Sequence, residues 1–384
     1  MRRKHFFLFI SVFTLALSVA AFYLGVKLIT WSNWPLNHQG IIWLSLAFFV
    51  FLQVLGPILY RLSPGHFNRL FIIHYLTYMS LGLFACMICY TLAADIILAL
   101  WKFFVSPEST ESFEKNSFYA VTFMAFGSVA IGIFQAAVGP RIYKVTVPLK
   151  NLPKAFDGFR IVQITDLHVG PIIGKNYTSN VVDLANELKP DLVALTGDFI
   201  DGTVPQLKDG IQPLAGLRSK HGSFYITGNH EYIWGADAWI EEFKNLGATV
   251  LLNEHVMIEK DGEKFALAGV TDLSGNFLHA KHQSDPFKAI QGLPEDLVKI
   301  LLAHQPKSYK RAQKAGYDLQ LSGHTHGGQF FPFSLIIALV ERFYKGLHQY
   351  KGMWIYTSRG TGFWGPPLRF TVPSEITLIE LRSA

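Results

Sequence analysis

The sequence predicts an N-terminal α-helical transmembrane bundle followed by an α/β domain. Three observations predict this. The chain has 384 residues, of which half are hydrophobic, and its mean hydropathy is positive. The apolar excess is concentrated before about Gly139. Beyond it, short buried runs of strand type alternate with segments that have the apolar spacing of helices, an order that builds a sheet with helices on its faces.

The N-terminal region contains four apolar runs, and a spanning helix needs about 20 predominantly apolar residues. They are Phe6–Ile29, Ile41–Tyr60, Phe71–Leu100 and Phe118–Val138. Each run is long enough to cross a bilayer. Asp95, near the end of the third run, is costly there unless it lies at the interface or faces a partner.

The first run also has features of a cleaved signal peptide. Met1–His5 is basic, and Ser18–Ala20 offers small residues for cleavage. However, the apolar run continues through Phe22–Val26, and three further spans follow. We therefore expect the first helix to remain in the protein.

The distribution of Lys and Arg predicts that both chain ends are cytoplasmic, because basic residues favour the cytoplasmic side. The N-terminus and the segments 61–70 and 141–154 are basic, whereas 30–40 contains no Lys or Arg. Lys102 and Lys115 in the third loop weaken the pattern. The sequence thus predicts a multi-pass cell-membrane protein with a cytoplasmic C-terminal domain.

Charge and cysteine content narrow the function classes. The net charge of +6 includes no basic runs interleaved with aromatics, so we expect no nucleic-acid partner. We interpret the basic residues as those that set the membrane topology and contact the membrane surface. Cys86 and Cys89 form a C-x-x-C pair within the third apolar run. We interpret them as small apolar residues of a buried helix, in preference to a redox or metal pair. The C-terminal part has no cysteine, which excludes disulfides there.

Four runs of strand type in the C-terminal part each lead directly into a polar cluster. The runs are Arg160–Thr165, Asp191–Thr196, Ser223–Thr227 and Lys299–Ala303. Helical spacing is found in Tyr177–Lys189 and Asp237–Leu246. Ligands of such sheets bind beyond the carboxyl ends of the strands. We therefore expect the polar clusters to converge on one edge of a sheet.

A fifth cluster, Leu321–Gln329, places His324 and His326 one residue apart between glycines. Such a turn can aim two imidazoles at one small volume, and neutral imidazole is the commonest metal ligand. Each cluster alone has an ordinary interpretation. Asp166 could cap a helix, Asp198 could form an Asx turn, and His304 could be a loop histidine. Five such clusters in succession favour a metal site instead.

Together the motifs resemble the signature of the calcineurin-like metallophosphoesterases. They are Asp166-x-His168, Gly197-Asp198-x-x-Asp201, Gly228-Asn229-His230-Glu231, His304 and Gly323-His324-x-His326. The resemblance covers about Phe159 to Leu381 and implies layered β-sheets flanked by helices. The Gly-His-Thr-His-Gly-Gly-Gln wording and the membrane segments are similar to the membrane-anchored bacterial branch. Some relatives in that branch cleave UDP-2,3-diacylglucosamine, and others are associated with the cell wall.

The resemblance also implies a role for each residue. Two divalent metals about 3.5–4 Å apart would neutralise the phosphoryl oxygens and supply a hydroxide at neutral pH. Asp198 would bridge them, with Asp166, His168 and His326 on one metal and Asn229, His304 and His324 on the other. His230 would contact the phosphate and assist the leaving oxygen, and Asp201 would orient a ligand. The mixed nitrogen and oxygen ligands suit Mn, Fe, Zn or Co.

The predicted domains are residues 1–140 for the transmembrane region, 141–158 for a linker or first strand, and 159–384 for the catalytic domain. Met353–Ser358 and Ile376–Leu381 are expected to be closing strands. Phe330–Val340 is too short to span a bilayer, and both a core helix and an interfacial segment fit it. Gly360–Phe370 is an aromatic, Gly/Pro-rich loop that could line the opening of the active site together with Phe330–Val340.

The function predicted from these observations is that of a membrane-anchored, binuclear-metal hydrolase of phosphoester or pyrophosphate bonds. Lipid-linked and nucleotide-linked substrates both fit. The alternative is a membrane scaffold or transport-related protein whose soluble domain binds metal or nucleotide without catalysis. The full ligand set favours the enzyme, and a single intramembrane acid makes a poor transport path.

Overall fold

The computed structural model describes residues 3–62, 70–104, 106–279 and 281–384. The chain groups into two compact units. A helical unit comprises 1–135 together with two short C-terminal segments, 330–333 and 365–371. An α/β unit comprises 136–329, 334–364 and 372–384. The chain therefore leaves the α/β unit twice and returns to it.

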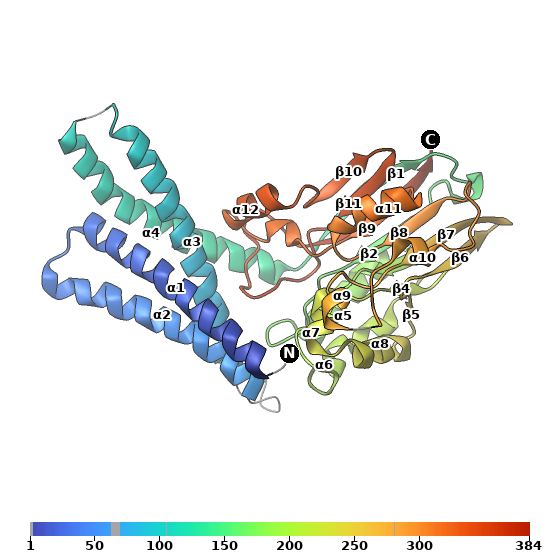
Figure 1. The fold of residues 1–384 in the computed structure, drawn as a ribbon, viewed down its shortest axis with the longest axis horizontal. Coiled ribbons are helices and arrows are strands. Elements are labelled where there is room, and N and C mark those ends of the chain that lie inside the picture. Colours follow the sequence, from blue (N-terminus) through green and yellow to red (C-terminus); the bar gives the residue numbers. More distant parts are fainter. Residues whose placement is uncertain (1–2, 63–69, 105, 280) are drawn as a thin grey trace. The chain divides into compact units, whose positions relative to one another are not determined.

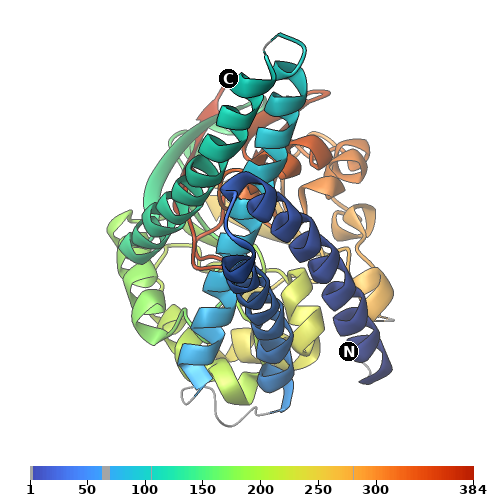
Figure 2. The same ribbon diagram turned by 90° about the vertical axis from the view of Figure 1, so that its left-hand side faces the viewer.

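Four long helices form the helical unit, as the apolar runs predict. They are drawn in blue to teal in Figure 1, and Figure 2 shows them after a 90° turn about the vertical axis. Each is long and apolar enough to cross a membrane. Their bounds are α1 (Arg3–Ser32), α2 (Leu36–Leu62), α3 (Phe71–Trp101) and α4 (Pro107–Val138).

Several polar groups inside the helical unit are paired across helices. Asp95 of α3 accepts hydrogen bonds from Lys27 Nζ at 2.8 Å and from the Tyr23 hydroxyl at 2.6 Å, both on α1. The Tyr90 hydroxyl of α3 meets the Ser128 hydroxyl of α4 at 2.7 Å. Asp95 thus faces a partner, the condition under which its position is acceptable.

The two C-terminal segments pack among the helices of this unit. Leu368 is buried in a cluster with Tyr90 of α3 and Val129 of α4. The backbone N–H of Arg369 donates to the carbonyl of Gly132 in α4 at 3.0 Å. The two segments also bind each other, because Phe331 N–H donates to the Phe370 carbonyl at 3.0 Å.

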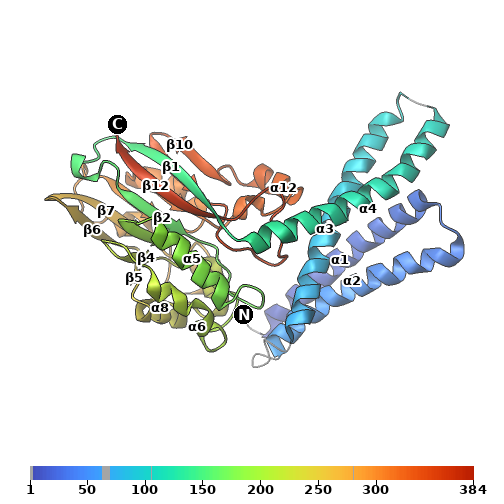
Figure 3. The same ribbon diagram turned by 180° about the vertical axis from the view of Figure 1, so that it is seen from behind.

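The α/β unit contains two six-stranded mixed sheets. Figure 3 shows β1, β12 and β2 of the first sheet lying side by side. The first sheet has the order β1 (Arg141–Leu149), β12 (Glu375–Ser383), β2 (Arg160–Ile164), β3 (Leu192–Leu195), β4 (Ser223–Tyr225) and β5 (Thr249–Val250). The second has the order β10 (Gly346–Tyr350), β11 (Met353–Thr357), β9 (Leu319–Ser322), β8 (Lys299–Leu302), β7 (Glu263–Gly269) and β6 (Glu254–Lys260).

Short helices connect and flank these strands. The α-helices of this unit are α5 (Lys175–Glu187), α6 (Val204–Ile211), α7 (Asn229–Trp234), α8 (Ala236–Asn245), α9 (Gly275–Leu278), α10 (Pro286–Ala289), α11 (Tyr309–Ala315) and α12 (Phe333–Val340). Helices α5 and α8 match the two predicted helical segments closely.

The main core lies between the two sheets. Ile161 and Phe224 of the first sheet belong to one buried cluster with Phe265, Ile300 and Leu319 of the second. This arrangement confirms the layered sheets flanked by helices. The expectation of a single sheet edge is wrong, because β2, β3 and β4 lie in one sheet and β8 and β9 in the other. Strands buried on both faces need a cover on each, and here the opposing sheet provides one of them.

The apolar stretch after the histidine turn forms the short helix α12. Its side chains are mostly exposed, with Leu335 56% and Leu339 88% accessible. The core-helix alternative for this stretch is therefore wrong. The exposed apolar surface agrees with an interfacial segment.

Candidate metal centre

The five polar clusters follow the carboxyl ends of β2, β3, β4, β8 and β9. Within each sheet these strands run parallel, so their following loops lie at the same end. The two sheets pack face to face, and the loops of both meet at that end of the core. This placement brings together side chains that are up to 160 residues apart in the sequence.

The backbone at the predicted ligands is unusual. Asp166, His168, Asp198, His324 and His326 all have positive φ, between 51° and 73°. Residues other than glycine adopt this left-handed region only at a cost in free energy, and residues strained in this way cluster at functional sites. The conformation turns each side chain sharply away from its strand and into the space between the loops.

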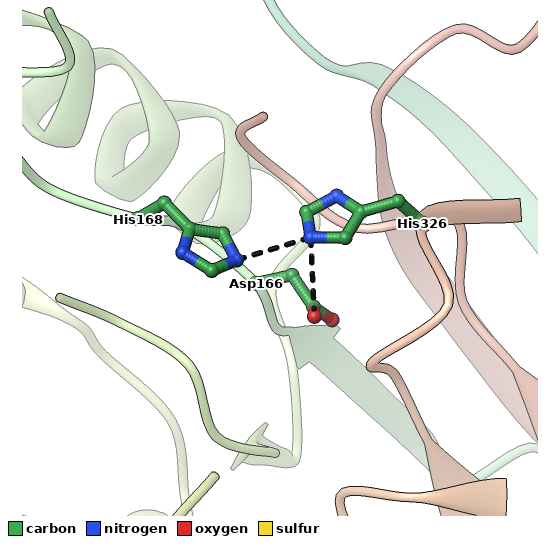
Figure 4. Close-up of side chains that lie close together, drawn as sticks. All are labelled: Asp166, His168 and His326. Carbon is green, nitrogen blue, oxygen red and sulfur yellow. Dashed lines mark hydrogen bonds and ion pairs between the residues drawn. The ribbon is translucent and has the colours of Figure 1, made fainter. Parts of the chain in front are cut away.

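Asp166, His168 and His326 form the first group of predicted ligands (Figure 4). His326 Nε2 lies 3.0 Å from His168 Nε2 and 3.5 Å from Asp166 Oδ1. His168 Nδ1 lies 3.2 Å from the carboxylate of Asp201, which orients the ring so that Nε2 faces the group. A carboxylate that orients a ligating histidine in this way is a common feature of metal sites.

Asp198, His304 and His324 form the second group. His304 Nε2 lies 3.1 Å from Asp198 Oδ2, and its Nδ1 donates to the Thr196 carbonyl at 2.8 Å. Among the residues that the structure describes, neither Asn229 Oδ1 nor His324 Nδ1 has a hydrogen-bond partner, although both atoms are buried. Buried polar atoms without partners are rare. A cation held by this group would satisfy both, so the residues fit a metal.

Asp198 lies between the two groups. Its Oδ2 is 3.1 Å from His304 and 4.0 Å from His168, which belong to different groups. Burial opposes ionisation of this carboxyl, but the charges of His304 and His230 outweigh it and hold its pKa well below the ordinary value. An ionised carboxylate in this position has lone pairs for two cations.

The two histidines of the second group differ in charge. Burial favours the neutral ring in both. In His304 the charge of Asp198 overcomes burial and raises the pKa well above the ordinary value. In His324 burial and the neighbouring charge of His304 lower the pKa to about 3. His324 is therefore already the neutral imidazole that a metal requires.

His230 and Asp201 lie beside the first group. His230 Nδ1 is 2.5 Å from Asp201 Oδ1, and its side chain is 12% exposed. Burial disfavours its charged form, but Asp198 and Asp201 overcome this and raise the pKa of His230 to about 9. Its ring also makes an edge contact with Trp364 at 5.8 Å between centroids. A protonated His230 would be a hydrogen-bond donor at the mouth of the centre.

Glu231 also shapes the candidate centre, although its motif alone assigned it no role. It is fully buried, and its carboxylate accepts backbone N–H groups from Gly228, Asp198 and Phe199 at 2.6–3.1 Å. It therefore fixes the loop that carries Asp198. The sequence carried a signal for this role, because a Glu three residues after a helix N-cap supplies the carboxylate half of a capping box. Glu231 makes that half here by accepting the N–H of Gly228, which has no side chain to make the other half.

Two glycines allow the loops to approach each other. A Cβ at Gly228 would collide with the Asp198 side chain, and one at Gly323 would collide with Asp166 and Thr165. Both positions lie directly before predicted ligands. The Gly-Asn-His and Gly-His-x-His motifs thus need glycine for space.

Comparisons with known proteins point to one protein family. The family model described as calcineurin-like phosphoesterase matches residues 159–328. A zebrafish "Transmembrane protein with metallophosphoesterase domain" is 32% identical over 80% of this chain and 74% of its own length. The bovine protein with that description is 37% identical over 66% of this chain and 60% of its own length.

A bacterial relative matches a similar share of this chain. An "Uncharacterized metallophosphoesterase" of Helicobacter pylori is 36% identical over 71% of this chain and 72% of its own length. The relatives thus include animal as well as bacterial proteins, a wider range than the bacterial branch alone. On these matches, the chain belongs to the calcineurin-like metallophosphoesterase family, in a form that carries apolar membrane-type helices.

Proposed function

We propose that the protein is a multi-pass membrane phosphoesterase that uses two divalent metal ions to hydrolyse phosphoester or pyrophosphate bonds. The observation that carries this proposal is the pair of buried ligand groups on either side of Asp198. Asp166, His168 and His326 would hold one ion. Asn229, His304 and His324 would hold the other, with Asp198 shared.

The chemistry divides between the metals and the chain. When bound, the ions would neutralise the phosphoryl oxygens and provide hydroxide at neutral pH. His230, held in its protonated form by Asp201, would donate a hydrogen bond to a phosphoryl oxygen and a proton to the departing oxygen. Asp201 binds both His168 and His230, so it would orient a ligand and the proton donor together.

The surface near the centre favours a phosphate carried by a lipid over a soluble nucleotide. Trp364, which contacts His230, is 55% exposed. Leu335, Leu339 and Val340 of α12, which begins four residues after Gln329, are all more than half exposed. Large exposed apolar surface marks a membrane or ligand contact. A substrate with its phosphate at the bilayer surface would meet both the metal ligands and this apolar rim.

The test uses the full-length protein purified in detergent. Activity should be lost in chelator and restored by Mn²⁺ or a similar ion, across a panel of phosphomonoesters, phosphodiesters and nucleotide-linked lipids. Asp198→Asn should reduce activity by at least about a hundredfold, because an amide has one coordinating oxygen and no charge. The matched control is Asp209→Asn, at an exposed position of α6. Full activity of Asp198→Asn would contradict the two-metal proposal.

A further inference from the structure

A third group of metal-type side chains lies outside the centre described above. It consists of Asp237, at the start of α8, with His279 and His282, which follow α9. One potential ligand atom from each residue lies within 4.8 Å of the other two. His279 Nε2 is already 3.1 Å from Asp237 Oδ2, and the two imidazole rings stack at 3.9 Å between centroids. Two imidazoles and a carboxylate are a common ligand set for zinc.

The hydrogen bonds of the two histidines leave nitrogen lone pairs available. His279 Nδ1 is buried and has no hydrogen-bond partner among the described residues, while its Nε2 faces Asp237. His282 Nδ1 lies 3.1 Å from the hydroxyl of Tyr232 in α7. A ligating histidine usually has such a partner on its second nitrogen, because that bond fixes the tautomer and the ring orientation.

The residues around the group hold this arrangement in place. The Tyr232 hydroxyl accepts a hydrogen bond from Thr227 at 3.2 Å. A Cβ at Gly275 would press on both the Tyr232 ring and the carbonyl of His282. Asp237 alone is well exposed, at 77% of its side chain, so it can move. Ligand atoms around tetrahedral zinc are separated by roughly 3.4 Å, given bond lengths of about 2.0–2.1 Å. A small rotation of the exposed Asp237 side chain would close the remaining gap.

We infer that Asp237, His279 and His282 bind a third divalent cation, of which Zn²⁺ is the best fit. The ion would use one ring nitrogen from each histidine and one carboxylate oxygen, and solvent would complete its coordination. It would join the start of α8 to the loop after α9. Through Tyr232 it would also steady α7, the helix that begins with Asn229 and His230. The inference does not depend on the proposed activity.

Burial and the charge of His279 lower the pKa of His282. The charge of Asp237 opposes this shift. The neutral ring is the form that coordinates a metal.

The test counts zinc in the full-length protein after equilibration with micromolar Zn²⁺ and removal of free metal. His282→Ala and Asp237→Asn should each lower the zinc content by one equivalent per chain. The matched control, His221→Ala, removes a histidine that packs on Phe159 away from the group and should lose none. Because the Asp237 side chain is exposed, Asp237→Asn should leave the fold intact, so a loss of zinc in this variant cannot be attributed to misfolding.

The difference between variant and wild type decides the question whether or not the binuclear centre is occupied. If the centre binds two ions, wild type should hold three zinc ions per chain and each variant two. If the centre binds none, wild type should hold one and each variant none. Failure of the proposed function would therefore be recognised separately. Equal zinc contents in wild type, His282→Ala and Asp237→Asn would overturn the inference.

Discussion

Glu231 shows how much a single side chain contributes to the geometry of this centre. It binds three backbone N–H groups, and two of them belong to Asp198 and Phe199. Those groups lie in a loop that must hold Asp198 at positive φ. Strained backbone persists only where its surroundings determine it fully, and Glu231 provides much of that determination here.

Replacing Glu231 with Gln should therefore destabilise the protein and weaken metal binding. The amide keeps one acceptor oxygen but directs an N–H₂ group at a backbone donor, and a buried donor left without an acceptor costs about 1–3 kcal/mol. Thermal unfolding and metal content measure the two effects. The control is Glu241→Gln on α8, whose side chain is 67% exposed. A wild-type melting temperature with full metal content would contradict this role.

Asp191 gives a prediction for pH dependence away from the centre. Burial alone would raise its pKa, but Lys220 and the backbone N–H of Arg160 overcome this and lower the pKa below its ordinary value. A depressed carboxyl pKa contributes stability that is fully present above the unfolded pKa of about 3.9. That stability is lost as the pH falls through the folded pKa.

Asp191→Asn should thus lower stability by about 1 kcal/mol at pH 7, and by progressively less as the pH falls from about 4 toward about 2. Thermal unfolding of both proteins across this pH range tests it. Asp183→Asn, at an exposed position of α5, should show no such trend. A deficit for Asp191→Asn that is constant with pH would show that the charge is not responsible.

The sequence predicted the candidate side chains better than their conformations. Short motifs specify residue type and order, so the Asp, Asn and His residues could be named in advance. Their positive φ values, the contact between Trp364 and His230, and the approach of Asp237 to the histidines at 279 and 282 depend on contacts between distant segments. Local spacing contains no information about such contacts.

At the scale of elements, apolar period and length predicted most of what the structure contains. The four long helices, α5, α8 and the strands before each polar cluster follow from local pattern. The division of those strands between two sheets could not be predicted. A fully buried strand has the same apolar sequence pattern whether helices or another sheet cover it. Parallel pairing between β1 and β12, which lie more than 200 residues apart, is equally invisible to local spacing.

Helix α12 provides the prediction at this scale. Replacing Leu335, Ile336 and Leu339 with Ser should raise the apparent KM for a lipid-linked substrate far more than for a small chromogenic phosphodiester. These side chains are 45–88% exposed, so the changes remove apolar surface without opening a core. Steady-state kinetics on both substrates measures it. Equal effects on the two substrates would refute the lipid-contact role of α12.

At the scale of the whole molecule, the distribution of Lys and Arg predicts which side of the membrane the centre occupies. A fluorescent reporter fused after Ala384 should be active, and an enzyme reporter that works only outside the cytoplasm should be silent. The same two reporters placed in the 30–40 loop should give the opposite result, since that loop contains no Lys or Arg. If the reporters at Ala384 behave in the reverse way, the orientation is inverted and an envelope substrate is favoured.

The two C-terminal segments that pack among the membrane-type helices impose an order on biosynthesis. Residues 330–333 and 365–371 leave the ribosome roughly 190 to 230 residues after α4 ends at Val138. At about 5–20 residues per second, the helices wait on the order of 10 to 50 s for their last packing partners. During that interval the helix positions that later receive Leu368 must remain open. Maturation of the helical unit thus depends on translation through residue 371, and a message cut short before it would leave the four helices with an unfinished core.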